Sequence, residues 1–120
     1  MYRVDVMYPK KPGSSFNFAH WSEVHLPMGL RLLKQHCGVS PIRVEACRSP
    51  YGPPGIDAHY HLINSLYFNT RDDADAFFRL FAIEEAAREL KADWPNYTQS
   101  DPEVMISEVI ECDPFTGRVR

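Results

Sequence analysis

Residues 59–68 read HYHLINSLYF, a run of aromatic and aliphatic residues with the length of one β-strand. Successive side chains of a strand point to opposite faces of its sheet, and in this run both faces are apolar. One face would carry Tyr60, Leu62, Leu66 and Phe68, and the other Ile63 and Tyr67. An exposed apolar sheet face of this size favours association. We therefore expect helices of the same chain to cover one face and a second copy of the chain, in a homodimer, to cover the other.

The flanking sequence supplies the remaining elements of an α+β domain. The expected strands are residues 2–8, 42–48, 59–68 and 104–111, and the expected helices are residues 18–36 and a segment capped by Thr70, kinked near Ala82 and ended by Trp94. In the order β-α-β-β-α-β, right-handed crossovers give a ferredoxin-like four-stranded antiparallel sheet with two helices on one face. The predicted domain spans residues 1–112, and residues 113–120 form a C-terminal tail.

The composition argues against several classes of function. The net charge is −3 and neither sign forms a block, so binding to nucleic acid or to a membrane surface is not expected. The cysteines Cys37, Cys47 and Cys112 are odd in number and widely spaced, which indicates neither a disulfide framework nor a zinc site and fits a reducing cytoplasm. No segment has the length and hydropathy of a membrane span. We predict a cytoplasmic protein without a metal or another cofactor.

The sequence around His25 breaks a rule of helix structure. Pro27 cannot donate a hydrogen bond to the carbonyl of Glu23, and it disfavours helix at the residue before it. Trp21 and Gly29 lie one turn before and after His25, so the imidazole would sit between an aromatic wall and a residue that permits close approach. Such a histidine could transfer protons near neutral pH. The alternative is a loop that ends at Pro27, with a new helix beginning there and His25 merely hydrogen-bonded.

Two further features have both a functional and a structural interpretation. His59 and His61 share one face of a strand, which is an acceptable geometry for two metal ligands. No acidic or cysteine residue stands at an obvious spacing from them, so we interpret them as strand-end histidines. Residues 49–57 are rich in glycine and proline and form either a lid over a site or a solvated connection between strands.

Four segments resemble the EthD family. They are residues 6–13 (VMYPKKPG), Trp21 with residues 25–27 (HLP), residues 93–98 (DWPNYT) and residues 106–109 (ISEV). The His-x-Pro and Asp-x-Pro-Asn-Tyr-Thr motifs are the most specific, since neither follows from generic helix or strand patterning. The resemblance extends to about Glu111, and Trp94 stands where the family usually has a smaller aliphatic residue.

The resemblance implies a dimeric α+β barrel in which two sheets pack face to face, in agreement with the two-sided strand at residues 59–68. The wider superfamily includes muconolactone isomerases, quinone-forming monooxygenases and haem-degrading enzymes. Most of these handle small cyclic or aromatic compounds in a cavity between sheet and helices. The resemblance therefore favours a functional role for His25.

The first functional hypothesis is a cofactor-independent enzyme of small-molecule catabolism, of the isomerase, dehydratase or monooxygenase type. In it His25 is the catalytic proton shuttle for a small hydrophobic or aromatic compound. Trp21 and Met28 would pack against this substrate, and Tyr97 or His61 would hydrogen-bond it. The hypothesis predicts a closed pocket on the order of several hundred cubic ångströms.

The second hypothesis is a non-catalytic accessory or ligand-binding dimer that supports an oxygenase in ether or aromatic degradation. A pocket filled by Leu33, Phe77 and Phe81 would favour it, because an aromatic stripe at helical spacing is typical of a packed core. A third hypothesis is a haem-linked oxygenase that uses a histidine as the axial ligand.

Overall fold

Four strands form one antiparallel sheet in the computed structural model, which describes all 120 residues, and their order is β2-β3-β1-β4. The central strand β1 (Tyr2–Pro9) pairs with β3 (Tyr60–Phe68) on one side and with β4 (Glu103–Glu108) on the other. Strand β2 (Arg43–Arg48) pairs with the outer edge of β3. The predicted antiparallel α+β fold of ferredoxin-like order is confirmed.

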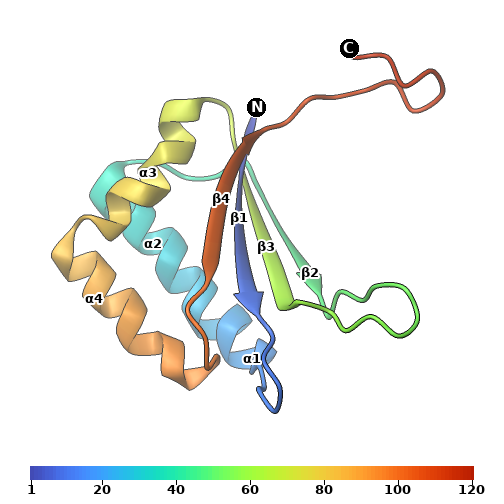
Figure 1. Ribbon diagram of the computed structural model, residues 1–120. Helices are drawn as coiled ribbons and strands as arrows, with labels where there is room; N and C mark the ends of the chain where they lie inside the picture. Colours follow the sequence, from blue (N-terminus) through green and yellow to red (C-terminus); the bar gives the residue numbers. More distant parts are fainter.

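All the helices lie on one side of this sheet (Figure 1). The first helical stretch consists of α1 (Phe18–His20), the π-helical turn η1 (Trp21–His25) and α2 (Leu26–Cys37). The second consists of α3 (Arg71–Phe81), α4 (Glu84–Asp93) and the short 3-10 turn η2 (Trp94–Asn96). The break between α3 and α4 falls at the kink predicted near Ala82, and the Thr70 hydroxyl accepts from the Asp73 N–H as the predicted cap.

The first helical stretch does not unwind ahead of Pro27. The N–H of Leu26 donates to the carbonyl of Trp21, five residues back, and this bond widens the helix into a π turn. Because Pro27 has no N–H and its ring would crowd the carbonyl of Glu23, a widened turn just before it accommodates the proline. The alternative of a loop that ends at Pro27 is therefore wrong, and the turn buries both Trp21 and His25.

The hydrophobic core fills the space between the sheet and the helices. The strand β3 contributes Leu62, Leu66 and Phe68 to it, and all three are buried. Asn64 interrupts this row, since it points to the same face and only 5% of its surface is exposed. The core-facing side of β3 is therefore apolar except at one central amide.

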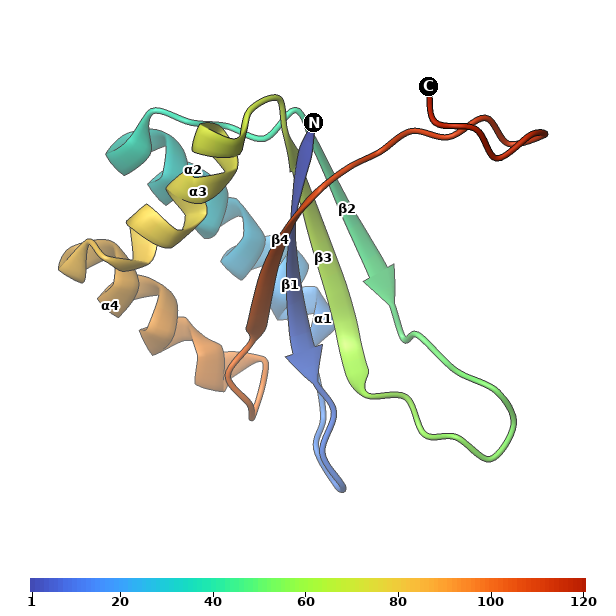
Figure 2. The same ribbon diagram turned by 45° about the horizontal axis from the view of Figure 1, so that its top comes forward.

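The other face of the sheet has no cover from the chain itself (Figure 2). It is not as apolar as the sequence predicted. Ion pairs at 2.9 Å join Arg3 to Asp5 and Arg43 to Glu45. Beside them lies Met105, which is 61% exposed. The outer face is thus mixed, because the charged residues of β1 and β2 lie on it beside exposed Met105.

Two segments extend away from the layers of sheet and helices. Residues 49–59 form the long connection between β2 and β3, and residues 109–120 follow β4 and turn back through a bridge between Cys112 and Val119 (Figure 2). The last strand ends at Glu108, before the predicted Glu111. None of the helices has the length and apolar character that a bilayer span requires.

Candidate functional site

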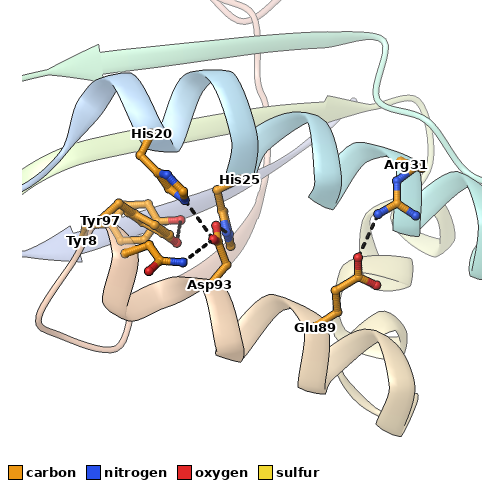
Figure 3. A network of polar contacts seen from close by, with 8 residues as sticks. Tyr8, His20, His25, Arg31, Glu89, Asp93 and Tyr97 are labelled. Atoms are coloured by element: carbon orange, nitrogen blue, oxygen red, sulfur yellow. Dashed lines mark hydrogen bonds and ion pairs between the residues drawn. The ribbon is translucent and has the colours of Figure 1, made fainter.

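Asp93, the last residue of α4, collects hydrogen bonds from three side chains (Figure 3). Its Oδ1 accepts from Nε2 of His20 at 2.8 Å and from Nδ2 of Asn96 at 2.9 Å, and its Oδ2 accepts from Nδ1 of His25 at 3.0 Å. The side chains of Asp93 and His25 are only 11% and 10% exposed. These bonds hold the His25 ring in one orientation in a largely dry setting.

The π turn explains why two histidines reach the same carboxylate. In an α-helix, residues five apart are separated by about 140° around the axis, so His20 and His25 would point to different sides. A hydrogen bond to the fifth residue back enlarges the turn and brings them to nearly the same side. Such π turns recur at functional sites in proteins.

The electrostatics of the site keep His25 neutral near pH 7. Burial lowers the pKa of His25 below its usual 6.5, although the hydrogen bond to Asp93 opposes this effect. Burial raises the pKa of Asp93, but the hydrogen bonds from Asn96, His20 and His25 outweigh it and the net pKa is lowered. A neutral imidazole that donates from Nδ1 to an ionised carboxylate has a free lone pair on Nε2, which makes no hydrogen bond within the protein. A neutral histidine with a free ring nitrogen is the form of the side chain that can accept a proton.

Two tyrosines complete the polar cluster. The ring of Tyr97 packs 4.6 Å from the ring of His25, and its hydroxyl donates to the hydroxyl of Tyr8 at 3.2 Å. The N–H of Asn17 donates to the carbonyl of Tyr97 and fixes the segment after η2. Burial raises the pKa of both phenols well above neutrality. Both remain protonated, so they act as hydrogen-bonding groups and not as acids.

An apolar cavity of about 50 Å³ lies between the sheet and the helices, beside Trp21 and His25. No lysine, arginine, aspartate or glutamate lines it. It is smaller than the several hundred cubic ångströms that the enzyme hypothesis predicts, because Leu33, Phe77 and Phe81 also line it and occupy much of the space. A ligand larger than a few atoms would have to displace some of these side chains.

The structure brings together some of the predicted site residues and separates others. Trp21 and His25 line the cavity, and Tyr97 adjoins it through its contact with the His25 ring. Met28 is half-buried on α2 and does not line the cavity. His61 does not line the cavity either.

His61 belongs to a different region of the molecule. Its Nε2 lies 2.9 Å from the hydroxyl of Ser14, and its ring stacks on Phe16 with 5.8 Å between the centroids. Several residues of the β2–β3 loop line a surface hollow of about 300 Å³ together with His61, and none of residues 49–57 lines the cavity beside His25. The loop therefore does not cover the candidate site within one chain.

Sequence reasoning left Asp93 and His20 without a role. Asp93 opens the segment 93–98, whose specific pattern was recognised, and that pattern was the available signal for it. No sequence pattern pointed to His20, because its approach to Asp93 depends on a π turn that helical periodicity does not predict. The structure contains no group of three or more His, Cys, Asp or Glu side chains placed to hold a metal ion.

Comparisons with known proteins agree with this architecture. The chain is similar to an EthD-like protein from Ralstonia eutropha JMP134, with 23% identity, a TM-score of 0.72, and coverage of 94% of this chain and 95% of that one. It is also similar to an ethyl tert-butyl ether d (EthD) family protein from Bacillus halodurans C-125, with 14% identity, a TM-score of 0.58 and coverage of 92% and 99%. At such identities these likenesses show the fold alone.

A weaker likeness, with 11% identity, a TM-score of 0.43 and coverage of 90% and 94%, joins the chain to a dimeric protein of unknown function and ferredoxin-like fold from Bacteroides fragilis NCTC 9343. No curated protein matches the sequence significantly. The model of the EthD domain, in contrast, matches residues 15–101, which include the π turn, the cavity-lining helices and the segment that follows α4. This match covers most of the chain, and the protein therefore belongs to the EthD family.

Proposed function

We propose that the protein is an enzyme that moves protons within a small, largely apolar cyclic or aromatic compound, as an isomerase or a dehydratase does. One observation carries the proposal. His25 is held through Nδ1 by a buried carboxylate, while its Nε2 has no protein partner and the residue lines an apolar cavity. A base in this arrangement can take a proton from a bound compound and return it to another atom of the same compound.

The nature of the other polar groups supports a reaction with a single base. The tyrosine pair beside His25 stays protonated, so it supplies hydrogen bonds and no second titrating group near neutral pH. Asp93 stays ionised and stabilises the imidazolium that forms when His25 accepts a proton. Proton removal and return by one imidazole is the simplest chemistry that uses these roles.

Deuterium exchange tests the proposal without knowledge of the natural substrate. A panel of small cyclic ketones and phenols is incubated with the protein in D₂O, and deuterium incorporation at carbon is followed by mass spectrometry. We expect at least one compound to exchange faster with the protein than in buffer. We expect His25→Gln to lower this rate at least about a hundredfold, since general base catalysis contributes that much.

His20→Gln is the matched control, because His20 binds the same carboxylate but does not line the cavity. This variant should keep most of the exchange activity. If no member of the panel exchanges, or if His25→Gln exchanges as fast as the wild type, the proposal is wrong.

We further propose that a second copy of the chain covers the outer face of the sheet. That face has no cover within the chain, and it presents the exposed Met105 next to the Arg3–Asp5 and Arg43–Glu45 pairs. Pairs of opposite charge can re-pair with those of an identical face across a two-fold axis. Sedimentation equilibrium should therefore show a dimer.

The small volume of the cavity favours a second candidate function, that of a non-catalytic accessory or ligand-binding dimer beside an oxygenase of ether or aromatic degradation. Leu33, Phe77 and Phe81 narrow the cavity as this hypothesis predicts. It predicts that the protein alone exchanges no panel compound, and that adding it changes the turnover of such an oxygenase. The exchange experiment above separates the two candidates.

A further inference from the structure

Two buried polar atoms at the cavity make no well-formed hydrogen bond in the protein. The Oδ1 of Asn64 and the Nε1 of Trp21 are both inaccessible to solvent. The Trp21 N–H lies near the Tyr8 hydroxyl and opposes the rise in the pKa of Tyr8 that burial causes, but this contact lacks hydrogen-bond geometry. Asn64 and Trp21 are 5% and 1% exposed, and both residues line the cavity beside His25. They come from opposite walls, because Asn64 lies on β3 and Trp21 lies on η1.

The position of Asn64 makes its unpaired amide informative. It stands on the core-facing row of β3 between Leu62 and Leu66, where an apolar side chain would pack without loss. Burying an amide with no partner costs free energy that a leucine of similar size would not. A residue that breaks the local pattern at such a cost marks a place where the protein trades stability for function.

The two atoms complement one another and together define the group that would satisfy them. An amide oxygen accepts a hydrogen bond, an indole N–H donates one, and a single hydroxyl group can donate to the first and accept from the second. If the amide were turned over, the amide and the indole would both donate, and the oxygen of one hydroxyl group could accept from both. No cationic side chain lines the cavity to balance a carboxylate or phosphate.

We propose that Asn64 and Trp21 form a polar anchor that selects neutral ring compounds with a hydroxyl group, and that holds them in the cavity beside His25 once side chains that narrow the cavity have been displaced. The inference deepens the proposed function and rests on the same cavity. In addition to the base His25, it assigns Asn64 and Trp21 as residues that determine specificity. The ligands that they favour are neutral phenols, enols and cyclic alcohols, and carboxylates are disfavoured.

Binding of phenol, benzene and benzoate tests the anchor. These probes share one ring and differ in having a hydroxyl group, no polar group or a carboxylate. Titrations are followed by ¹H–¹⁵N spectra of the Trp21 indole and the Asn64 side-chain amide. We expect phenol to bind about tenfold or more tightly than benzene, with both resonances shifted, and benzoate to bind more weakly than phenol.

Asn64→Leu should remove the preference for phenol over benzene while raising the melting temperature, because it replaces the unpaired amide. Asn64→Val provides the same comparison if the leucine variant does not fold. Ser100→Ala is the matched control, since the hydroxyl of Ser100 is also buried and unpaired but does not line this cavity. It should leave the preference unchanged.

The inference is overturned if phenol does not bind the wild type, if benzene binds as tightly, or if the preference survives in the Asn64 variants. His25→Gln separates it from the proposed function. If that variant still prefers phenol but the wild type exchanges no deuterium, the anchor stands and the catalytic proposal falls. If exchange depends on His25 but phenol and benzene bind equally, the catalytic proposal stands and the anchor falls.

Discussion

Replacing Asp93 with alanine removes the acceptor of three hydrogen bonds at once, and it should destabilise the fold strongly. The bond from His25 is largely buried, with both side chains near one-tenth exposed, and a hydrogen bond to a charged group contributes about 1.5–3 kcal/mol. His20 is 24% exposed and Asn96 is exposed, so their bonds contribute less, about 0.5–1 kcal/mol each. The loss in the free energy of unfolding is therefore about 3 kcal/mol near pH 7.

Urea and thermal unfolding at pH 7 measure this loss. For a chain of this length, about 3 kcal/mol lowers the melting temperature by about 12 °C. Glu89→Ala is the control, because it removes an ion pair with Arg31 in which both side chains are about half exposed (Figure 3). Such a surface pair contributes at most about 1 kcal/mol.

The difference in the free energy of unfolding between the wild type and Asp93→Ala should change with pH in a defined direction. The hydrogen bond to Asp93 opposes the lowering of the His25 pKa by burial, so the folded pKa of His25 falls further below 6.5 in the variant. As the pH falls through 6.5, the variant therefore loses more of its free energy of unfolding than the wild type does. The folded pKa of Asp93 lies below 3.8, so the stability from its ionised form is present above that value and is lost as the pH falls through the folded pKa. The difference in the free energy of unfolding between the two proteins should therefore increase below pH 6.5 and decrease below pH 4. A loss under about 1 kcal/mol at pH 7, similar to that of Glu89→Ala, would refute the central role of this carboxylate.

Three further predictions concern separate parts of the molecule. An NMR titration of His25 should give a pKa below 6.5, because burial outweighs the Asp93 bond, and a value above 6.5 would contradict the assignment of a neutral base. Gly29→Ala should raise the free energy of unfolding by about 0.5–1 kcal/mol in urea unfolding, since a methyl group there meets only Leu90, at 3.8 Å, and alanine favours helix; a net loss would mean that the methyl group disturbs the cavity wall. Met105→Asp should convert the dimer to a monomer in sedimentation equilibrium, whereas Phe78→Asp, a change at a half-exposed residue of α3, should leave the dimer intact; equal effects of the two variants would contradict the proposed interface.

Most of the fold was predictable from short-range patterns. The expected strands at residues 2–8 and 59–68, the cap at Thr70 and the break near Ala82 all correspond to observed elements. These features depend on neighbours within a few residues, and such neighbours are visible in the sequence. The strand ends shifted by a few residues, as at Glu108, because pairing across the sheet determines where a strand stops.

The candidate site was predictable only in part. His25 and Trp21 could be singled out because Pro27 disturbs the helix next to them, and the structure buries both. The roles suggested for Met28 and His61 rested on nearness in sequence or on residue type, and these properties do not determine which side of an element faces the cavity. The size of the cavity could not be predicted from the sequence either, because it depends on how the side chains of α2 and α3 pack against the sheet.

The sequence by itself determined the order of the elements, the sheet they form and the family of the protein, because periodicity, caps and motifs are local properties of the chain. Only the tertiary structure brought His25 and His20 to Asp93 through a π turn, and only it placed Asn64 and Trp21 in the lining of one cavity. These residues lie far apart in the chain or depend on an irregular turn. Their hydrogen bonds, burial and pKa shifts arise from packing between elements, which no local pattern encodes.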